Sequence, residues 1–298
     1  MPDEVRHTRA RRLRTGADLY AGDGLTRRCK GILEFEAGSV RIRFEDRTGD
    51  LEIRREAIRV LVCALPEGKR WDWLLQKSVE LGVTHILPLV CDHSDRMDFN
   101  ADRSRRIIQE AAAQSRRFWL PRIAEQSISF DQLTGLISAA VLQPHISHSG
   151  EILPIKGWEL NPAPDLTAQA EAGELPPMHQ NNPATLPSVL KLPVVHFLPD
   201  PGAATGMQSF IGTHRELLEK MNSNHEKTDS LSDSIRIFWI GPEGGFSKRE
   251  LQLFDGLKSV MAPADAPPVF FSRVRLGRSI LRVETAALAA LAMNLPDD

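Results

Sequence analysis

Residues 235–247, Ile235-Arg-Ile-Phe-Trp-Ile-Gly-Pro-Glu-Gly-Gly-Phe-Ser247, decide the fold class of this chain. The stretch begins as an apolar, β-branched and aromatic run, which favours a buried strand, and it breaks abruptly at Gly241-Pro242-Glu243-Gly244-Gly245. Glycines permit positive φ and let a ligand approach the bare backbone, while Pro242 stiffens the turn. Ser247 and Glu250 then form a capping-box pattern that predicts a helix over residues 248–257. A strand, a glycine loop and a helix in this order indicate a ligand site at the carboxyl edge of a parallel sheet.

A second unit of the same kind lies near the C-terminus. Residues 269–274 are strand-like, Leu276-Gly277 breaks the run, and residues 280–294 predict an alanine-rich helix. Three charged residues lie near the start of this helix, namely Arg278, Arg282 and Glu284. Two such units, each with glycine and charge at the loop, are hard to explain as plain connections.

Together the two units resemble the RsmE family of SPOUT-class methyltransferases. The matching segments are Ile240–Ser247 (IGPEGGFS), Leu276–Leu291 (LGRSILRVETAALAAL), Lys77–Gly82 (KSVELG) and Glu110–Ser115 (EAAAQS), in the family's order over most of the chain apart from residues 143–192. The resemblance implies S-adenosylmethionine as cofactor and methylation of N3 of a uridine in 16S ribosomal RNA. It also implies an α/β SPOUT domain with a parallel sheet and a trefoil knot, preceded by a small PUA-like β-barrel, and a homodimer packed through the knot.

Composition is that of a soluble globular protein, with 42% hydrophobic and 26% charged residues among 298. A net charge of −2 excludes a whole-molecule field that attracts nucleic acid, so an RNA surface has to be a local patch. The three cysteines form no C-x-x-C pair and indicate a reducing compartment without a disulfide framework. No run has the pattern of a signal peptide or a membrane span, so we expect a cytoplasmic protein without a membrane partner.

The first 30 residues carry eight Arg and Lys against four acids. Short alternating segments follow at residues 17–20, 31–36, 39–44 and 51–54, and their turn signals predict a small β-barrel over residues 1–56. Arginines bind phosphate oxygens bidentately, which favours RNA contact over a solvated edge. The candidate RNA-binding residues here are Arg9, Arg11, Arg12 and Arg14. The resemblance implies a PUA-like RNA-binding domain at this position.

Residues 57–298 have an α/β pattern. Residues 58–65 and 85–90 predict strands around a helix over residues 70–81, with Trp73, Leu74, Lys77 and Leu81 at helical spacing. Residues 103–117 predict a second helix with an apolar face opposite a basic one. Lys77, Arg116, Arg117 and Arg278 complete the candidate RNA contacts.

Residues 143–192 hold eight of the twenty prolines and little periodicity, which indicates an insertion outside the resemblance. His145 and His148 within it lack the further ligands of a metal site, so we expect no metal. Residues 194–198 predict the strand that supplies the third wall of the cofactor pocket, and residues 139–142 are the alternative. Residues 213–221 predict a helix.

The chain has neither a G-x-G-x-x-G after a strand nor a Walker A motif, which argues against a dinucleotide or a nucleoside triphosphate. Main-chain groups at glycine turns suit recognition of adenosine. The candidate cofactor-binding residues are Leu198, Pro199, Ile240, Gly241, Pro242, Gly244, Gly245, Leu276, Gly277, Ile280, Leu281 and Thr285.

Uridine N3 is a weak nucleophile until it loses its proton, and a cation near the base carbonyls favours that loss. Arg282 is our candidate for this catalytic role, with Arg278 second. Glu243 is a candidate either to accept the proton or to accompany the positive sulfonium, and Glu284 either orients Arg282 or forms an ion pair at the helix start. The general base stays unassigned.

The chain departs from the family at Ser279, where an arginine usually precedes Ile-Leu-Arg. Two rival hypotheses stay open, and Ser279 with the long insertion motivates the second. One is a SPOUT methyltransferase that acts on another RNA position, such as a ribose 2′-hydroxyl. The other is a non-catalytic RNA-binding protein of ribosome assembly. The expected partner in each case is RNA, as 16S ribosomal RNA or the small ribosomal subunit for the favoured function.

Overall fold

The computed structural model describes residues 13–22, 27–36, 39–43, 52–53, 58–117, 120–142, 193–222, 234–259 and 268–295. Arg9, Arg11, Arg12 and the proline-rich segment 143–192 with its two histidines lie outside the described residues. The chain divides into two compact units, residues 1–56 with 112–120 and residues 57–111 with 121–298.

The first unit contains a small antiparallel sheet. Its strands are β1 (Asp18–Gly22), β2 (Arg27–Glu36), β3 (Ser39–Arg43) and β4 (Glu52–Ile53), in the order β1-β2-β3 with β4 also paired to β2. Leu33 of β2 is fully buried, as the alternation of apolar and polar residues along this strand requires. The sheet is consistent with the barrel-like domain that the sequence predicts.

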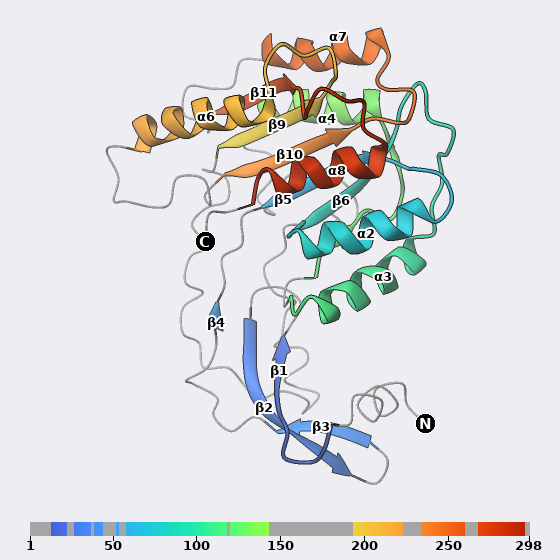
Figure 1. The fold of residues 1–298 in the computed structure, drawn as a ribbon, viewed down its shortest axis with the longest axis vertical. Coiled ribbons are helices and arrows are strands. Elements are labelled where there is room, and N and C mark those ends of the chain that lie inside the picture. Colours follow the sequence, from blue (N-terminus) through green and yellow to red (C-terminus); the bar gives the residue numbers. More distant parts are fainter. Residues whose placement is uncertain are drawn as a thin grey trace. The chain divides into compact units, whose positions relative to one another are not determined.

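A parallel sheet forms the centre of the second unit, which confirms the predicted α/β class (Figure 1). The strand order is β11-β9-β10-β5-β6-β7, and β8 pairs with β6. The strands are β5 (Arg59–Ala64), β6 (His85–Val90), β7 (Arg122–Ile123), β8 (Ile128–Ser129), β9 (Val194–Pro199), β10 (Ile235–Ile240) and β11 (Val269–Val274). Pairings between neighbours are all parallel, so the carboxyl ends of these strands share one edge.

Helices cover both faces of this sheet. They are α2 (Arg70–Glu80), α3 (Ala101–Gln114), α4 (Phe130–Leu142), α6 (Met207–Asn222), α7 (Lys248–Gly256) and α8 (Val283–Ala292), and a short 3-10 turn (Leu257–Ser259) follows α7. Helices α2 and α8 pack against each other, and α8 also lies on β5 and β10, whereas α4 packs against α7 (Figure 1).

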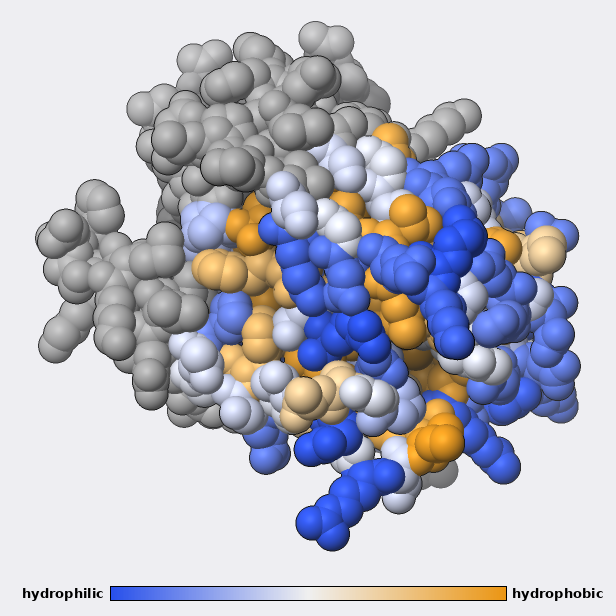
Figure 2. Space-filling view, turned by 90° about the horizontal axis from the view of Figure 1, so that it is seen from above, coloured by the Kyte–Doolittle hydropathy of each residue, from blue (hydrophilic) through white to orange (hydrophobic). Residues whose placement is uncertain are grey.

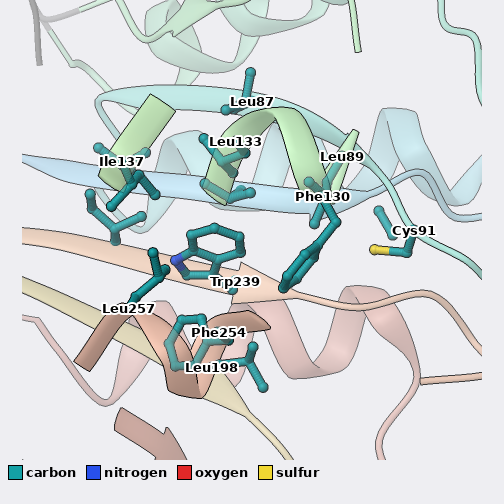
Figure 3. Close-up of a cluster of buried hydrophobic side chains, with 14 of the residues drawn as sticks. Leu87, Leu89, Cys91, Phe130, Leu133, Ile137, Leu198, Trp239, Phe254 and Leu257 are labelled. Carbon is teal, nitrogen blue, oxygen red and sulfur yellow. The ribbon is translucent and has the colours of Figure 1, made fainter. Parts of the chain in front are cut away.

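The central strand β10 divides its side chains between the two faces. Trp239 is fully buried and lies between Leu133 of α4 and Phe254 of α7 (Figure 3). Its ring centroid is 5.2 Å from that of Phe130 and 5.5 Å from that of Phe254. On the opposite face, the ring of Phe238 stacks on Phe197 of β9 at 5.3 Å. Both faces of β10 are therefore buried, which explains why its sequence is a nearly continuous apolar run.

Strand β9 confirms the favoured prediction for residues 194–198, because it pairs with both β10 and β11. The alternative strand at residues 139–142 is wrong, since these residues end α4. That helix was not predicted, because the short apolar run at its end does not distinguish a buried helix from a strand.

Several predicted helix ends also need correction. Helix α3 ends at Gln114, three residues early, and Arg116 has a left-handed φ of 57°. Helix α6 begins at Met207 instead of residue 213, and α8 begins at Val283 instead of residue 280. Tertiary contacts set these ends, which local propensity places only approximately.

Trp73 is a further correction. The buried face of α2 consists of Trp71, Leu74, Leu75, Ser78 and Val79. Trp73 is 45% exposed and belongs, with Ile280 at 85%, to the small set of large hydrophobic side chains exposed in the described part of the chain. The face of the described surface that is seen from above is largely hydrophilic, with hydrophobic patches between charged side chains (Figure 2).

Candidate ligand site at the carboxyl edge of the sheet

Three neighbouring strands deliver the predicted loops to one edge. Strand β9 lies between β10 and β11, with Phe238 opposite Phe197 and Val274 opposite Pro199. The loops that follow Pro199, Ile240 and Val274 therefore leave the sheet side by side. This brings together predicted cofactor-binding residues from three segments far apart in sequence.

Backbone hydrogen bonds join two of these loops. The Asp200 amide donates to the Val274 carbonyl at 2.9 Å, the Arg275 amide to Thr205 at 2.8 Å, and the Met207 amide to Arg275 at 3.0 Å. In addition, the guanidinium of Arg273, a residue of β11, pairs with the carboxylates of Asp200 and Asp255. The loop after β9 and the loop after β11 are thus held as one wall.

The loop from Leu276 to Arg282 leaves its main-chain donors available. Among the described residues, none of its backbone amides donates a hydrogen bond to another protein group. Gly277 has an ordinary φ, and a Cβ built on it would meet nothing within 4 Å. No packing contact therefore requires glycine at this position, whereas the approach of a bound molecule to the backbone would explain it.

The glycine loop after β10 is built differently. Gly245 has a φ of 72°, and its amide closes a turn on the Pro242 carbonyl at 2.8 Å. A Cβ at Gly241 would lie 3.0 Å from the ring of Phe246, and one at Gly244 would lie 3.1 Å from the Cβ of His93. These glycines are needed by the fold of the loop itself, in addition to any role toward a ligand.

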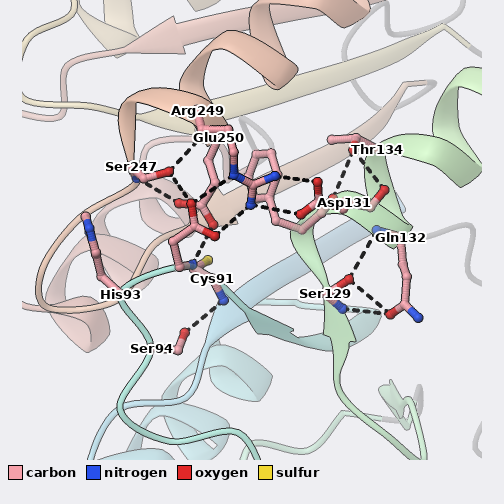
Figure 4. A network of polar contacts seen from close by, with 12 residues as sticks. Cys91, His93, Ser94, Ser129, Asp131, Gln132, Thr134, Ser247, Arg249 and Glu250 are labelled. Atoms are coloured by element: carbon pink, nitrogen blue, oxygen red, sulfur yellow. Dashed lines mark hydrogen bonds and ion pairs between the residues drawn. The ribbon is translucent and has the colours of Figure 1, made fainter.

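A buried carboxylate anchors the end of this loop. Glu250 is fully buried and accepts from the Ser247 amide at 2.7 Å and from the Asp92 amide at 2.9 Å, while its own amide donates to the Ser247 hydroxyl (Figure 4). The predicted capping box is thereby confirmed. Its carboxylate has the additional task of binding the segment after β6 to the start of α7.

Arg249 links three elements beside this anchor. Its guanidinium binds Asp92 at 2.6 Å and Asp131 of α4 at 2.5 Å, as Figure 4 shows for the Asp131 contact. Hydrogen bonds from Arg249 hold the pKa of both aspartates below the ordinary value, with Ser247 also contributing at Asp92. The sequence did not point to this network, because its members are isolated charged residues on separate segments.

An open pocket of about 990 Å³ lies beside the loop before α8. It is lined by Glu67, Gly68, Lys69, Arg70, Trp73, Ile280, Leu281, Arg282, Glu284 and Thr285. The second half of this set was predicted, with Glu284 as a partner of Arg282. The first half was missed, although residues 67–70 form a glycine-containing, charged connection between a strand and a helix, the same signal as in the two loops that were recognised.

The predicted catalytic residues differ in their surroundings. Glu243 is paired with Arg70, whose Nη1 lies 3.2 Å from Oε1 of the carboxylate. Arg282 is exposed and is the N-cap of α8, and its side chain makes no hydrogen bond or ion pair with described residues. Neither alternative for Glu284, orientation of Arg282 or an ion pair with it at the helix start, is seen among the described residues. Arg278 is likewise exposed.

Glu284 is the unusual acid of the pocket. It is only 7% exposed, and its Oε2 finds no hydrogen-bond partner among the described residues. Burial raises the pKa of the nearby Cys63 thiol, and the charges of Glu243 and Glu284 raise it further. Of these two carboxylates, Glu243 pairs with Arg70, whereas Glu284 has no cationic partner among the described residues.

The candidate RNA-binding residues are dispersed. Lys77 pairs with Glu80 at 2.7 Å, and Arg116 and Arg117 follow the end of α3. Arg14 is exposed in the first unit. In the described residues, no group of three or more His, Cys, Asp or Glu side chains could hold a metal ion, and none of the helices is long and apolar enough to cross a bilayer.

Comparison with known proteins gives one family. A family model for the RNA methyltransferase domain matches residues 56–155 and 203–294. A ribosomal RNA small subunit methyltransferase E from Rickettsia conorii is 33% identical over 97 residues. This match spans 30% of the chain and 35% of the Rickettsia protein.

Solved structures resemble nearly the whole chain. One, from Legionella pneumophila and described as a methyltransferase with its cofactor S-adenosylmethionine bound, has a TM-score of 0.56 at 20% identity, with 99% of this chain and 89% of that chain covered. Another is ribosomal RNA small subunit methyltransferase E from Neisseria gonorrhoeae bound to S-adenosylmethionine, with a TM-score of 0.55 at 22% identity and 97% and 87% coverage. The fold is therefore of the SPOUT type that the sequence predicts. Because the family model matches well over half of its length, the chain belongs to the family of RNA methyltransferase domains, and its predicted resemblance to RsmE is confirmed.

Proposed function

We propose that this protein transfers a methyl group from S-adenosylmethionine to N3 of a specific uridine in 16S ribosomal RNA. The observation that carries the proposal is the wall formed by the loops after β9 and β11, next to the glycine loop after β10. The amides of residues 276–282 in this wall donate no hydrogen bond to another described group. Related folds bind this cofactor, as the Legionella and Neisseria structures do.

The residues at the edge fit an adenosine-bearing methyl donor. Leu198, Pro199 and Ile240 lie at the ends of their strands, and the glycines at 241, 244, 245 and 277 leave main-chain amides and carbonyls accessible in the loops that follow β10 and β11. Such groups can satisfy the hydrogen-bonding edge of adenine and a ribose without a charged partner. When bound, the donor supplies an electrophilic methyl group on a sulfonium.

Arg282 is the candidate residue that activates the uracil ring for methylation. It is exposed in the pocket and has no carboxylate partner among the described residues, so its full charge is available to the carbonyl oxygens of uracil. A cation there stabilises the anion that forms when N3 loses its proton, which lowers the barrier to in-line attack. The carboxylate of Glu243 is less available to accept the proton, because it is already paired with Arg70.

In this proposal the first unit is a PUA-like domain that recognises RNA. Further RNA contacts come from Lys77, Arg116, Arg117 and Arg278. The basic residues Arg9, Arg11, Arg12 and Arg14 would contact phosphates. A knotted chain, a homodimer and a cytoplasmic location complete the proposal, since each accompanies the RsmE resemblance.

The test is methylation of small ribosomal subunits from a bacterial strain that lacks its own enzyme for this position. Purified protein and isotopically labelled S-adenosylmethionine are added, the 16S RNA is digested, and the modified nucleoside is identified by mass spectrometry. We expect 3-methyluridine at one site. A 2′-O-methylated nucleoside would favour the rival enzyme, and RNA binding without cofactor binding in calorimetry would favour the non-catalytic rival.

A further inference from the structure

The pocket between the β5–α2 connection and the loop before α8 carries groups that packing alone does not explain. Trp73 and Ile280 are exposed at its walls, although Trp71 and Leu74 show that α2 buries its other large apolar side chains. An exposed indole presents a flat apolar face at a thermodynamic cost. A planar ligand that stacks on it would recover that cost.

The positive charges of the pocket are also unfavourably placed in the protein alone. Lys69 is the N-cap of α2 and Arg282 the N-cap of α8, and neither side chain makes a capping hydrogen bond. Helix N-termini carry partial positive charge and favour anions, so cations there are destabilising. A phosphate between them would be bound by the side-chain charges and by both helix ends.

Glu284 supplies the remaining signal. A carboxylate oxygen that is buried without a partner loses its hydration and gains no hydrogen bond in return. Because an ionised carboxylate only accepts hydrogen bonds, its missing partner has to be a donor. A ligand that complements this pocket would therefore supply a planar group, an anion and a hydrogen-bond donor.

We propose that this pocket binds the target uridine after it has turned out of the RNA, with Trp73 stacked on the base and Glu284 accepting the N3 proton. This inference rests on the proposed function. A volume of about 990 Å³ accommodates a nucleotide with an adjoining phosphate. Stacking on aromatic side chains and reading of the Watson–Crick edge are the usual means by which proteins recognise a splayed base.

Glu284 would also select uracil. Uracil carries a hydrogen on N3, which donates to the carboxylate, whereas cytosine presents a lone pair there, which the carboxylate repels. In the reaction the N3–H bond breaks and its proton passes to the Glu284 carboxylate, and from there to solvent. The electron pair on N3 forms the bond to the incoming methyl carbon, and sulfur keeps the electron pair of the bond that the methyl group leaves. Glu284 is thus assigned the role of general base.

The first experiment compares wild type with Glu284→Gln and with Glu125→Gln. Glu125 is an exposed carboxylate paired with Arg105 near the β7 edge, so its variant is the matched control. Turnover on unmodified small ribosomal subunits should fall at least a hundredfold in Glu284→Gln and stay within twofold in the control. Calorimetry should give cofactor dissociation constants within threefold of wild type for both variants.

Failure of this inference is separable from failure of the proposed function. If the wild-type protein leaves the subunits unmodified, the proposed function is wrong. Two results with an active wild type would show that Glu284 is not the general base. One is turnover of Glu284→Gln within threefold of wild type, and the other is a parallel loss of cofactor binding. Circular dichroism and melting temperature are measured on each variant, and a Glu284→Gln protein that does not fold is replaced by Glu284→Asp, for which the same losses are expected.

A binding experiment tests the pocket without turnover. Uridine and cytidine 5′-monophosphates are titrated into protein loaded with S-adenosylhomocysteine and followed by NMR. Wild type should prefer the uridine nucleotide at least fivefold, and Glu284→Gln should lose this preference, because its amide can donate to cytosine N3. Trp73→Ala should weaken both nucleotides at least fivefold and Trp73→Phe less than twofold. Equal binding of both nucleotides to wild type, or unchanged binding by Trp73→Ala, contradicts the proposal.

Discussion

At the scale of single residues, Arg282 and Glu250 show how charged groups in one site serve different ends. The side chain of Arg282 is exposed and has no partner among the described residues, which leaves its charge for a substrate. Glu250 is fully buried, and its carboxylate accepts hydrogen bonds from the backbone amides of Ser247 and Asp92. The side chain of Arg282 is thus available for catalysis, whereas that of Glu250 stabilises the loop structure.

For Arg282→Ala we therefore expect loss of turnover with folding and cofactor affinity retained. The cation acts on the developing anion and contributes nothing to packing, so the loss should be about a hundredfold or more. Single-turnover methylation and calorimetry measure the two properties separately. Turnover equal to that of wild type would remove Arg282 from the catalytic assignment.

Glu250→Gln should behave in the opposite way. One carboxylate oxygen is replaced by an amide NH₂ that faces a backbone N–H, so a buried donor loses its acceptor. We expect the free energy of unfolding to fall by about 2–4 kcal/mol. Urea denaturation measures this loss, and Glu243→Gln, at an exposed ion pair, should change it by less than about 1 kcal/mol.

The Arg249 network predicts a dependence of stability on pH. Because Arg249 lowers the pKa of Asp92 and Asp131 in the folded state, their contribution is present above the ordinary value of 3.8 and is lost as pH falls through the lowered values. Arg249→Met should flatten the stability curve in this acid range. The effect is modest and shrinks in salt, since these groups are exposed. Thermal melts between pH 5 and about 2.5, at low and high salt, measure it; identical slopes in both proteins would contradict it.

At the scale of elements, the two glycine loops have the same signature in sequence and different physical requirements. Gly245 requires glycine because its φ is positive, whereas Gly277 has an ordinary φ and open space around it. Composition alone cannot separate these cases. Only the backbone conformation and the neighbouring atoms do.

A matched pair of alanine variants tests this distinction. Gly245→Ala should destabilise the fold by about 1–2 kcal/mol, since an L-residue pays for the left-handed conformation. Gly277→Ala should leave the melting temperature unchanged and weaken S-adenosylmethionine binding about tenfold, which corresponds to 1.4 kcal/mol. Differential scanning calorimetry and titration calorimetry report the two effects. Wild-type cofactor affinity in Gly277→Ala would show that the loop before α8 does not touch the donor.

At the scale of the second unit as a whole, burial of neutral imidazoles makes its fold acid-sensitive. Burial lowers the pKa of His85 and His196 to about 3, and the charge of Arg122 contributes at His85. The unfolded chain binds these protons near 6.5, so stability is complete above that pH and is lost as pH falls from 6.5 toward 3. Each histidine contributes a slope of up to about 1.4 kcal/mol per pH unit.

His196→Asn isolates one of these contributions. The Nε1 of Trp239 donates to Nδ1 of His196 at 3.1 Å, and the asparagine oxygen can accept in its place. The variant should lose stability less steeply than wild type between pH 6.5 and about 4. Denaturant melts across this range provide the measurement, and a parallel curve would show that His196 does not titrate with unfolding.

Elements that depend on local chemistry could be predicted from the sequence. Strand β11 and strand β6 match their predicted residues, and the capping box at Ser247 and Glu250 was visible because its partners are three residues apart. The loops were also recognisable, since glycine and proline act on their own backbone. Features that depend on interactions between residues close together in the chain could therefore be predicted from the sequence.

Tertiary structure alone decided how these parts meet. Two features join segments far apart in the chain, namely the position of β9 between β10 and β11 and the pairing of Arg70 with Glu243. The outward orientation of Trp73 depends on which face of α2 is buried against such segments. The start of α8 at Val283 likewise removed Ile280 and Leu281 from the predicted helix and placed them at the pocket. Contacts across such distances depend on which faces become buried, and that is settled only when the whole sheet is assembled.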